Sequence, residues 1–121
     1  MGSDPDTLDA AGSPAPLRMV LVGHLTPDAL QQELSRIESQ LRGDDPAILV
    51  VDCTRMKGYE AGARSLFTEW NAAHRHQIRK VAIAVSNPLW HMVIATMSLL
   101  SAQTMRPFST VEAAIAWARE H

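Results

Sequence analysis

Strand-like segments alternate with helical patterns four times along this chain. Three are mainly apolar runs, at about residues 19–22, 47–53 and 81–85, and the fourth is the short segment 106–108, expected as an edge strand because proline cannot donate to a central ladder. Between and after them, apolar residues recur at steps of three and four, which is typical of helices packed on one face. Strands that alternate with helices favour right-handed crossovers and a parallel sheet. The pattern predicts a single-domain α/β fold, a mostly parallel four-stranded sheet with helices packed on it, and leaves the direction of the first strand open.

The run that ends at Asp52 is expected to be the centre of this sheet. Residues 47–51 are all apolar, so both faces of this strand are suited to burial under helices. A polar segment with Gly58 and Gly62 follows, and the next helix is predicted over about residues 60–74. In open α/β sheets, ligands and partners gather at the carboxyl ends of the strands. We therefore expect the segment up to Gly62 to be a turn at the functional end of the sheet, with Asp52 and Thr54 as its anchors.

The predicted helices differ in how clearly they are marked. Thr26 followed by Pro27 is a typical N-cap and first helical residue, and Ser109 with Glu112 three residues later is a capping box. The predicted helix over residues 88–102 contains no Asp, Glu, Lys or Arg. A helix that is apolar beyond one stripe is either deeply buried or part of a binding surface. One face of this helix is predicted to consist of Leu89, Met92, Val93, Thr96, Met97 and Leu100, while Trp90, Ile94 and Leu99 point elsewhere.

Composition and charge narrow the class of protein. A chain of 121 residues suffices for one domain with its own core, and we expect that domain over residues 16–121 after a flexible tail over residues 1–15. The net charge of -2, without any cluster of Lys or Arg, argues against a nucleic-acid partner. The uncharged segment 81–105 is interrupted by Pro88, so we interpret it as strand plus helix and expect no integral membrane segment. A single cysteine and the lack of a secretory signal after Met1 favour the cytoplasm.

Asp52 has an alternative role as a phosphoacceptor. It stands at a strand end with Met56 after it, as in the receiver domains of response regulators. Such a site needs an acidic pair at the end of the first strand to hold Mg²⁺, and Gly23 and His24 occupy that place. We therefore interpret Asp52 as a hydrogen-bonded anchor.

Cysteine and histidine residues suggest two further kinds of site. Cys53 and one of the five histidines are the residue types of a nucleophile and its base, but a lone cysteine at the end of a buried strand is more often a core residue. His74 and His76 are two residues apart, so their side chains diverge on a helix and no third metal ligand is spaced nearby. We expect no enzyme activity, no metal and no cofactor.

Trp90 lies five residues after the end of the third apolar run, at the first turn of a predicted helix. In a parallel sheet this position lies near the segment that follows Asp52, so Trp90 would form an apolar rim there with Tyr59 and His91 as polar groups. The alternative is that Trp90 packs under the last helix. Periodicity does not distinguish these two positions.

Several of these residues together resemble a known family. They are Gly23 and Leu25, Ile48 to Asp52 with Thr54, Gly62, Val81 to Val85, and the closing Phe108, Glu112, Ala113 and Trp117. This set resembles the STAS domain, the fold of the anti-sigma factor antagonists, and is more similar to the SpoIIAA-like (STAS/SEC14-like) family. The resemblance spans about residues 17–117 and implies a STAS-like, non-enzymatic module for protein interactions in signalling.

The resemblance also bears on the turn before the second predicted helix. In the anti-sigma factor antagonists this turn carries a phosphorylatable serine just ahead of a glycine. If Gly62 is that glycine, Ala61 takes the place of the serine, so a phosphorylation switch of that type is not expected. Glu60 is then either a charged residue that imitates such a switch or an ordinary acidic residue of a first helical turn.

Two functions remain open from the sequence. The first is a regulatory module that binds a regulatory protein or, as a homodimer, a second copy of this chain. The residues expected to bind that partner are Gly58, Tyr59, Glu60, Ala61, Gly62, Trp90 and His91. The alternative is a carrier or sensor of a small, lipid-like apolar ligand, suggested by the apolar surplus of residues 88–102 and by the SEC14-like side of the resemblance.

Overall fold

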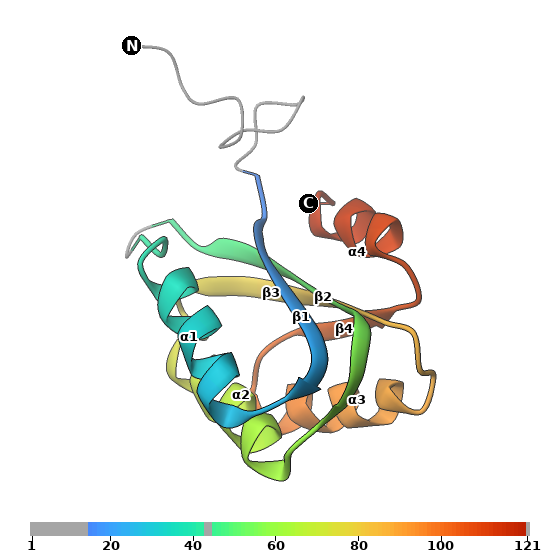
Figure 1. Ribbon diagram of the computed structural model, residues 1–121. Helices are drawn as coiled ribbons and strands as arrows, with labels where there is room; N and C mark the ends of the chain where they lie inside the picture. Colours follow the sequence, from blue (N-terminus) through green and yellow to red (C-terminus); the bar gives the residue numbers. More distant parts are fainter. Residues whose placement is uncertain (1–14, 43–44, 121) are drawn as a thin grey trace.

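Strands and helices alternate along the chain in the predicted order (Figure 1). The computed structural model describes residues 15–42 and 45–120, so the expected tail lies almost wholly outside the described residues. The described elements are β1 (Leu17–Leu25), α1 (Pro27–Glu38), β2 (Ala47–Tyr59), α2 (Ala61–Ala73), β3 (Ile78–Val85), α3 (Trp90–Ser101), β4 (Met105–Phe108) and α4 (Val111–Ala118). The predicted α/β fold class is confirmed.

All neighbouring strands of the sheet are parallel. Their order is β1-β2-β3-β4, which also settles the direction of β1. The turn expected after Thr54 is wrong, because β2 continues to Tyr59 and pairs with β1 along this extension. β2 takes one extra residue between Asp52 and Arg55 and another between Met56 and Gly58, as in β-bulges. Figure 1 shows the resulting bend of β2 around β1.

The two faces of the sheet are covered unequally. Right-handed crossovers that all step in one direction place their connecting helices on one face, and α1, α2 and α3 share a core with the sheet there. The opposite face packs against α4, which follows the last strand. That second core is small and rich in alanine, with Val50, Ala82, Ala84, Ala114 and Ala118 buried in it.

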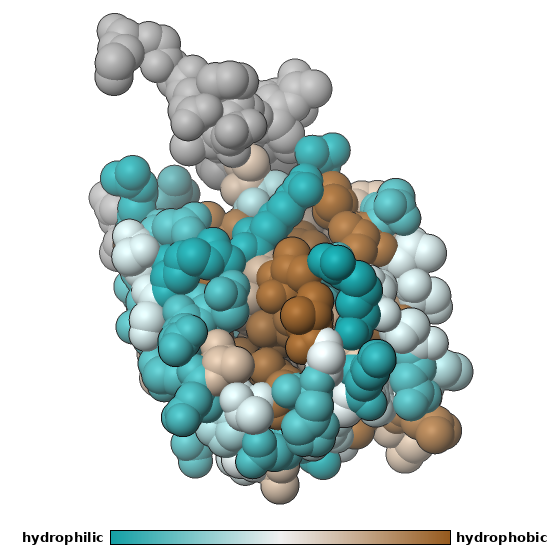
Figure 2. Space-filling view, viewed as in Figure 1, coloured by the Kyte–Doolittle hydropathy of each residue, from teal (hydrophilic) through white to brown (hydrophobic). Residues whose placement is uncertain are grey.

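α4 leaves part of its face of the sheet uncovered. It packs mainly on β2 and β3, and Val20 and Val22 of β1 are left 46% and 55% exposed. Figure 2 shows a hydrophobic area over β1 with hydrophilic side chains on both sides.

The N-cap predicted for α1 is observed, and that of α4 lies one residue later than predicted. Thr26 caps α1 as predicted, since its hydroxyl oxygen accepts a hydrogen bond from the Ala29 amide at 3.2 Å. For α4 the cap is Thr110 and not Ser109, because the Thr110 hydroxyl accepts from the Ala113 amide at 3.1 Å. Both residues are competent caps, and the extended backbone at residue 110 decides between them.

The face predicted for α3 is only in part the one that packs on the sheet, since Met97 is buried and Val93 half-buried but the other members are exposed. Ile94, Met97 and Ser101 are the buried residues of this helix, whereas Leu89 and Met92 are 77% and 78% exposed. Leu99 and Leu100 are also exposed, at 85% and 71%. The error has a physical cause: without charged residues, the apolar positions of α3 fit more than one face equally well.

Candidate functional site

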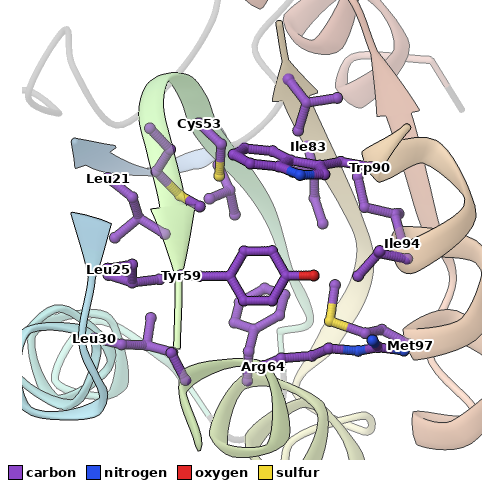
Figure 3. Close-up of a pocket in the computed structure, with 16 residues that line it drawn as sticks. Leu21, Leu25, Leu30, Cys53, Tyr59, Arg64, Ile83, Trp90, Ile94 and Met97 are labelled. Carbon is purple, nitrogen blue, oxygen red and sulfur yellow. The ribbon is translucent and has the colours of Figure 1, made fainter. Parts of the chain in front are cut away.

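A cavity of about 70 Å³ lies between the sheet and the helices α1, α2 and α3. Figure 3 shows its side chains converging from β1, β2 and β3 on one side and from the helices on the other. Arg64 carries the only formal charge among the lining residues, and nearly all the others are apolar. The lining consists of Leu21, Leu25, Leu30, Val51, Cys53, Met56, Tyr59, Ala63, Arg64, Phe67, Ile83, Val85, Trp90, Val93, Ile94 and Met97.

Tyr59 and Trp90 meet at this cavity. Their rings form an edge-to-face pair with centroids 5.8 Å apart and an angle of 73° between the planes. Both residues are partly buried and line the cavity. Of the two positions open for Trp90, the structure therefore has the one beside Tyr59. The last helix packs instead on Phe108 through Trp117, whose ring centroids lie 5.6 Å apart.

Cys53 lies in the wall of the cavity as a neutral thiol. It is buried, and its burial raises the pKa of the thiol from 9.0 to about 12, with a further contribution from the adjacent Asp52 carboxylate. A nucleophilic cysteine requires the opposite shift, because the thiolate is the reactive form. The structure therefore supports the interpretation of Cys53 as a core residue.

Asp52 and Thr54 are bonded to each other inside β2. One Asp52 carboxylate oxygen accepts hydrogen bonds from the Thr54 amide at 3.0 Å and from the Thr54 hydroxyl at 2.6 Å. These residues lie where the pairing of β2 with β1 first shifts register. Their hydrogen bonds therefore stabilise a β-bulge at a position where a loop was predicted. Side chains alternate along a strand, which puts Asp52 and Cys53 on opposite faces of the sheet. They do not form a catalytic pair.

The segment from Gly58 to Gly62 joins the end of β2 to the start of α2. Glu60, Ala61 and Gly62 are exposed, and the Glu60 amide donates to the Leu25 carbonyl at 3.0 Å, which ties the segment to the end of β1. A Cβ atom on Gly62 would lie 3.0 Å from Cγ of Pro27, and one on Gly58 would lie 3.2 Å from Nδ1 of His24. Close packing against α1 and β1 accounts for both glycines.

The histidines considered as ligands have other roles. His74 stacks on Trp70 with ring centroids 4.4 Å apart, and its Nδ1 lies 2.8 Å from the Trp70 carbonyl oxygen. His76 is exposed. In residues 15–42 and 45–120, no group of three or more His, Cys, Asp or Glu side chains is placed to hold a metal ion. His91 is partly buried in the first turn of α3, next to Trp90.

Several residues that line the cavity were not predicted from the sequence as site residues. Arg64, Val93 and Ile94 line the cavity, although none was singled out as a site residue. Arg64 directly follows Ala63, a buried residue of α2, so it stands at the border of the buried face of this helix. The sequence signal for Arg64 is thus weak, because a charged residue beside an apolar stripe is usually solvated.

Comparison with known proteins now adds to this geometry. The family model described as SpoIIAA-like matches residues 17–119. Among solved structures, the chain is similar to an uncharacterized protein with a SpoIIAA-like fold from Shewanella loihica PV-4, with a TM-score of 0.67 and 22% sequence identity. The match covers 82% of this chain and 80% of that one. No curated protein matches the chain. In the part of the chain that the structure describes, no helix has the length and apolar character needed to cross a bilayer.

Proposed function

This chain belongs to the SpoIIAA-like family, and from that premise we propose that it is a non-enzymatic module that binds a small apolar ligand in the cavity beside Tyr59 and Trp90. The observation that carries the proposal is the cavity itself. This space of about 70 Å³ is partly open to solvent, so a ligand can enter it between the sheet and the helices. Its lining is nearly all apolar, which suits a hydrocarbon group and disfavours water.

The surroundings of the cavity support this function. Ligand sites are typically apolar clefts with a small number of polar groups, and they occur at the carboxyl ends of parallel strands. Tyr59 ends β2, Val85 ends β3, and both line the cavity. Cys53 is a neutral thiol in its wall, so the proposal assigns no chemical step to the site.

The test fills the cavity by substitution. Ala63 is 1% exposed and lines the cavity, so Ala63→Leu places three more carbon atoms in it. Ala73→Leu is the matched control, since Ala73 is exposed near the end of the same helix. The probe is 1-octanol, an uncharged apolar alcohol small enough for this cavity, titrated by isothermal calorimetry. We expect the wild-type protein and Ala73→Leu to bind it alike and Ala63→Leu to bind it at least tenfold more weakly. No binding by the wild type, or equal binding by all three, refutes the proposal.

A second candidate function is a regulatory module that binds a second copy of this chain. The observation that favours it is the outer face of α3, where Leu89, Met92, Leu99 and Leu100 are all more than 70% exposed. A contiguous apolar patch of this kind marks interaction sites. The patch holds no charge, so two copies meeting through it leave no ionised group buried and unpaired.

Light scattering coupled to size-exclusion chromatography tests the second candidate. We expect the wild-type protein to form dimers and Leu99→Lys to be monomeric, because the substitution puts a charge in the middle of the contact. Val22→Lys is the control, since Val22 is 55% exposed on the other side of the sheet and should leave the dimer intact. A wild-type chain that stays monomeric at 100 μM rules out self-association, and copurification of another protein would point to a different regulatory partner.

The surface around the segment from Gly58 to Gly62 is part of the second candidate function. The segment from Gly58 to Gly62, with Trp90 and His91, is proposed as the rim that a regulatory partner contacts. Ala61 has no hydroxyl group, so the proposed regulation does not use phosphorylation at that position. We place the protein in the cytoplasm.

A further inference from the structure

The cavity has one charged residue at its edge, Arg64, and among the described residues its side chain has no hydrogen-bond or ion-pair partner. Arg64 is partly buried near the start of α2. The recorded hydrogen bonds of residue 64 involve its backbone amide and carbonyl groups. No carboxylate among the described residues lies within ion-pair distance of its guanidinium group. An unpaired guanidinium beside an apolar cavity is a binding group for an anion.

Tyr59 supplies a second donor on the same side. Figure 3 shows Arg64 extending from α2 toward α3, next to Met97, and the Tyr59 hydroxyl pointing toward α3 as well. Among the residues described, the Tyr59 hydroxyl has no hydrogen-bond partner either. The site thus combines an apolar interior with two donors at one edge, and both lack an acceptor.

The size of the cavity limits the apolar part of the ligand. The cavity provides about 70 Å³ of space for a ligand and is partly open to solvent. A saturated chain of medium length extends into this space, and its head group then lies at the edge of the cavity. A single planar guanidinium with one hydroxyl matches one planar carboxylate.

From these observations, and resting on the proposed ligand-binding function, we propose that the ligand is a medium-chain monocarboxylate. Its hydrocarbon chain lies in the cavity, and its carboxylate accepts hydrogen bonds from the Arg64 guanidinium and the Tyr59 hydroxyl. Arg64 thereby selects an anionic amphiphile over a neutral or cationic one of the same length.

Three probes of equal chain length separate the head group from the chain. They are octanoate, 1-octanol and octylammonium, titrated into the full chain at pH 7 by isothermal calorimetry. We expect octanoate to bind at least tenfold more tightly than 1-octanol, and octylammonium to bind most weakly. Equal binding of octanoate and 1-octanol overturns the assignment to Arg64 and leaves the apolar cavity as a ligand site. No binding of any probe overturns the proposed function as well.

Substitution of Arg64 completes the test. Charge-assisted hydrogen bonds are among the stronger ones, so Arg64→Gln should weaken octanoate binding by about 10- to 100-fold and leave 1-octanol within about twofold. Arg55→Gln is the control for the lost charge, because Arg55 is exposed and is not among the lining residues. Octanoate binding that falls equally in both variants would show a general charge effect and would overturn the role of Arg64. Arg64 is partly exposed, so its replacement should not unfold the chain, and thermal melts check this.

Discussion

Cys53 provides a sharp test of the cavity wall, because its chemistry depends directly on burial. An ordinary thiol with a pKa of 9.0 is about 9% ionised at pH 8, whereas a pKa of about 12 lowers the thiolate fraction about 1,000-fold. Thiolate nucleophilicity rises with pKa, and this offsets about 20-fold of that loss. The net effect is a reaction about 50-fold slower than that of an ordinary thiol. Steric exclusion slows it further, since Cys53 is only 6% exposed.

The assay is the reaction of the protein with Ellman's reagent at pH 8. The chain contains one cysteine, so all of the released chromophore reports on Cys53. The reference is the same chain in 8 M urea, corrected for the effect of urea on a free cysteine derivative. We expect a native rate at least 50-fold lower than the unfolded rate. A native rate within fivefold of the unfolded one would refute the buried, neutral thiol and with it this wall of the cavity.

Four further predictions follow from the packing. Because the folded pKa of Cys53 lies above the unfolded value of 9.0, the free energy of unfolding in urea should fall above pH 9 by about 1.4 kcal/mol per pH unit until about pH 12, relative to Cys53→Ala. Thr110→Ala should cost about 1 kcal/mol in the same assay and Ser109→Ala less than about 0.5 kcal/mol, since Thr110 is the cap; equal costs would contradict this. Ala84→Leu should cost about 1–3 kcal/mol by overpacking the core under α4, and the exposed control Ala116→Leu less than about 0.5 kcal/mol. Asp52→Ala should cost about 1–2 kcal/mol by removing two hydrogen bonds in β2, and an unchanged midpoint would show that the bulge holds without them.

Two elements show why parts of the structure were not predictable from local patterns. Residues 55–59 of β2 contain Arg55, Lys57 and Gly58, a composition typical of a turn, and they form a strand because β1 pairs with them through two bulges. α3 has no charged residue to mark its solvent side, so its periodicity did not identify the face that packs on the sheet. In both cases the deciding interaction is with a segment far away in the sequence.

Some residues of the site were predicted from the sequence and others were not. Tyr59 and Trp90 were expected at one rim because the carboxyl ends of parallel strands share an edge of the sheet, and the two rings do meet there. Arg64 was not expected, because its role depends on the space beside it and on the absence of a carboxylate partner among the described residues. The residues next to Arg64 in the sequence indicate neither the cavity nor the lack of a nearby carboxylate.

The sequence alone determined the α/β class, the order of the elements, the cap of α1 and the similarity to the SpoIIAA-like family. The first three follow from apolar periodicity and capping residues, which act within a few positions along the chain, and the similarity rests on particular residues such as Phe108 and Trp117. Only the tertiary structure decided the extension of β2, the exposed face of α3 and the cavity with its unpaired Arg64. The side chains that line the cavity come from six separate elements. The space between them depends on how all six elements pack together, which no local sequence pattern specifies.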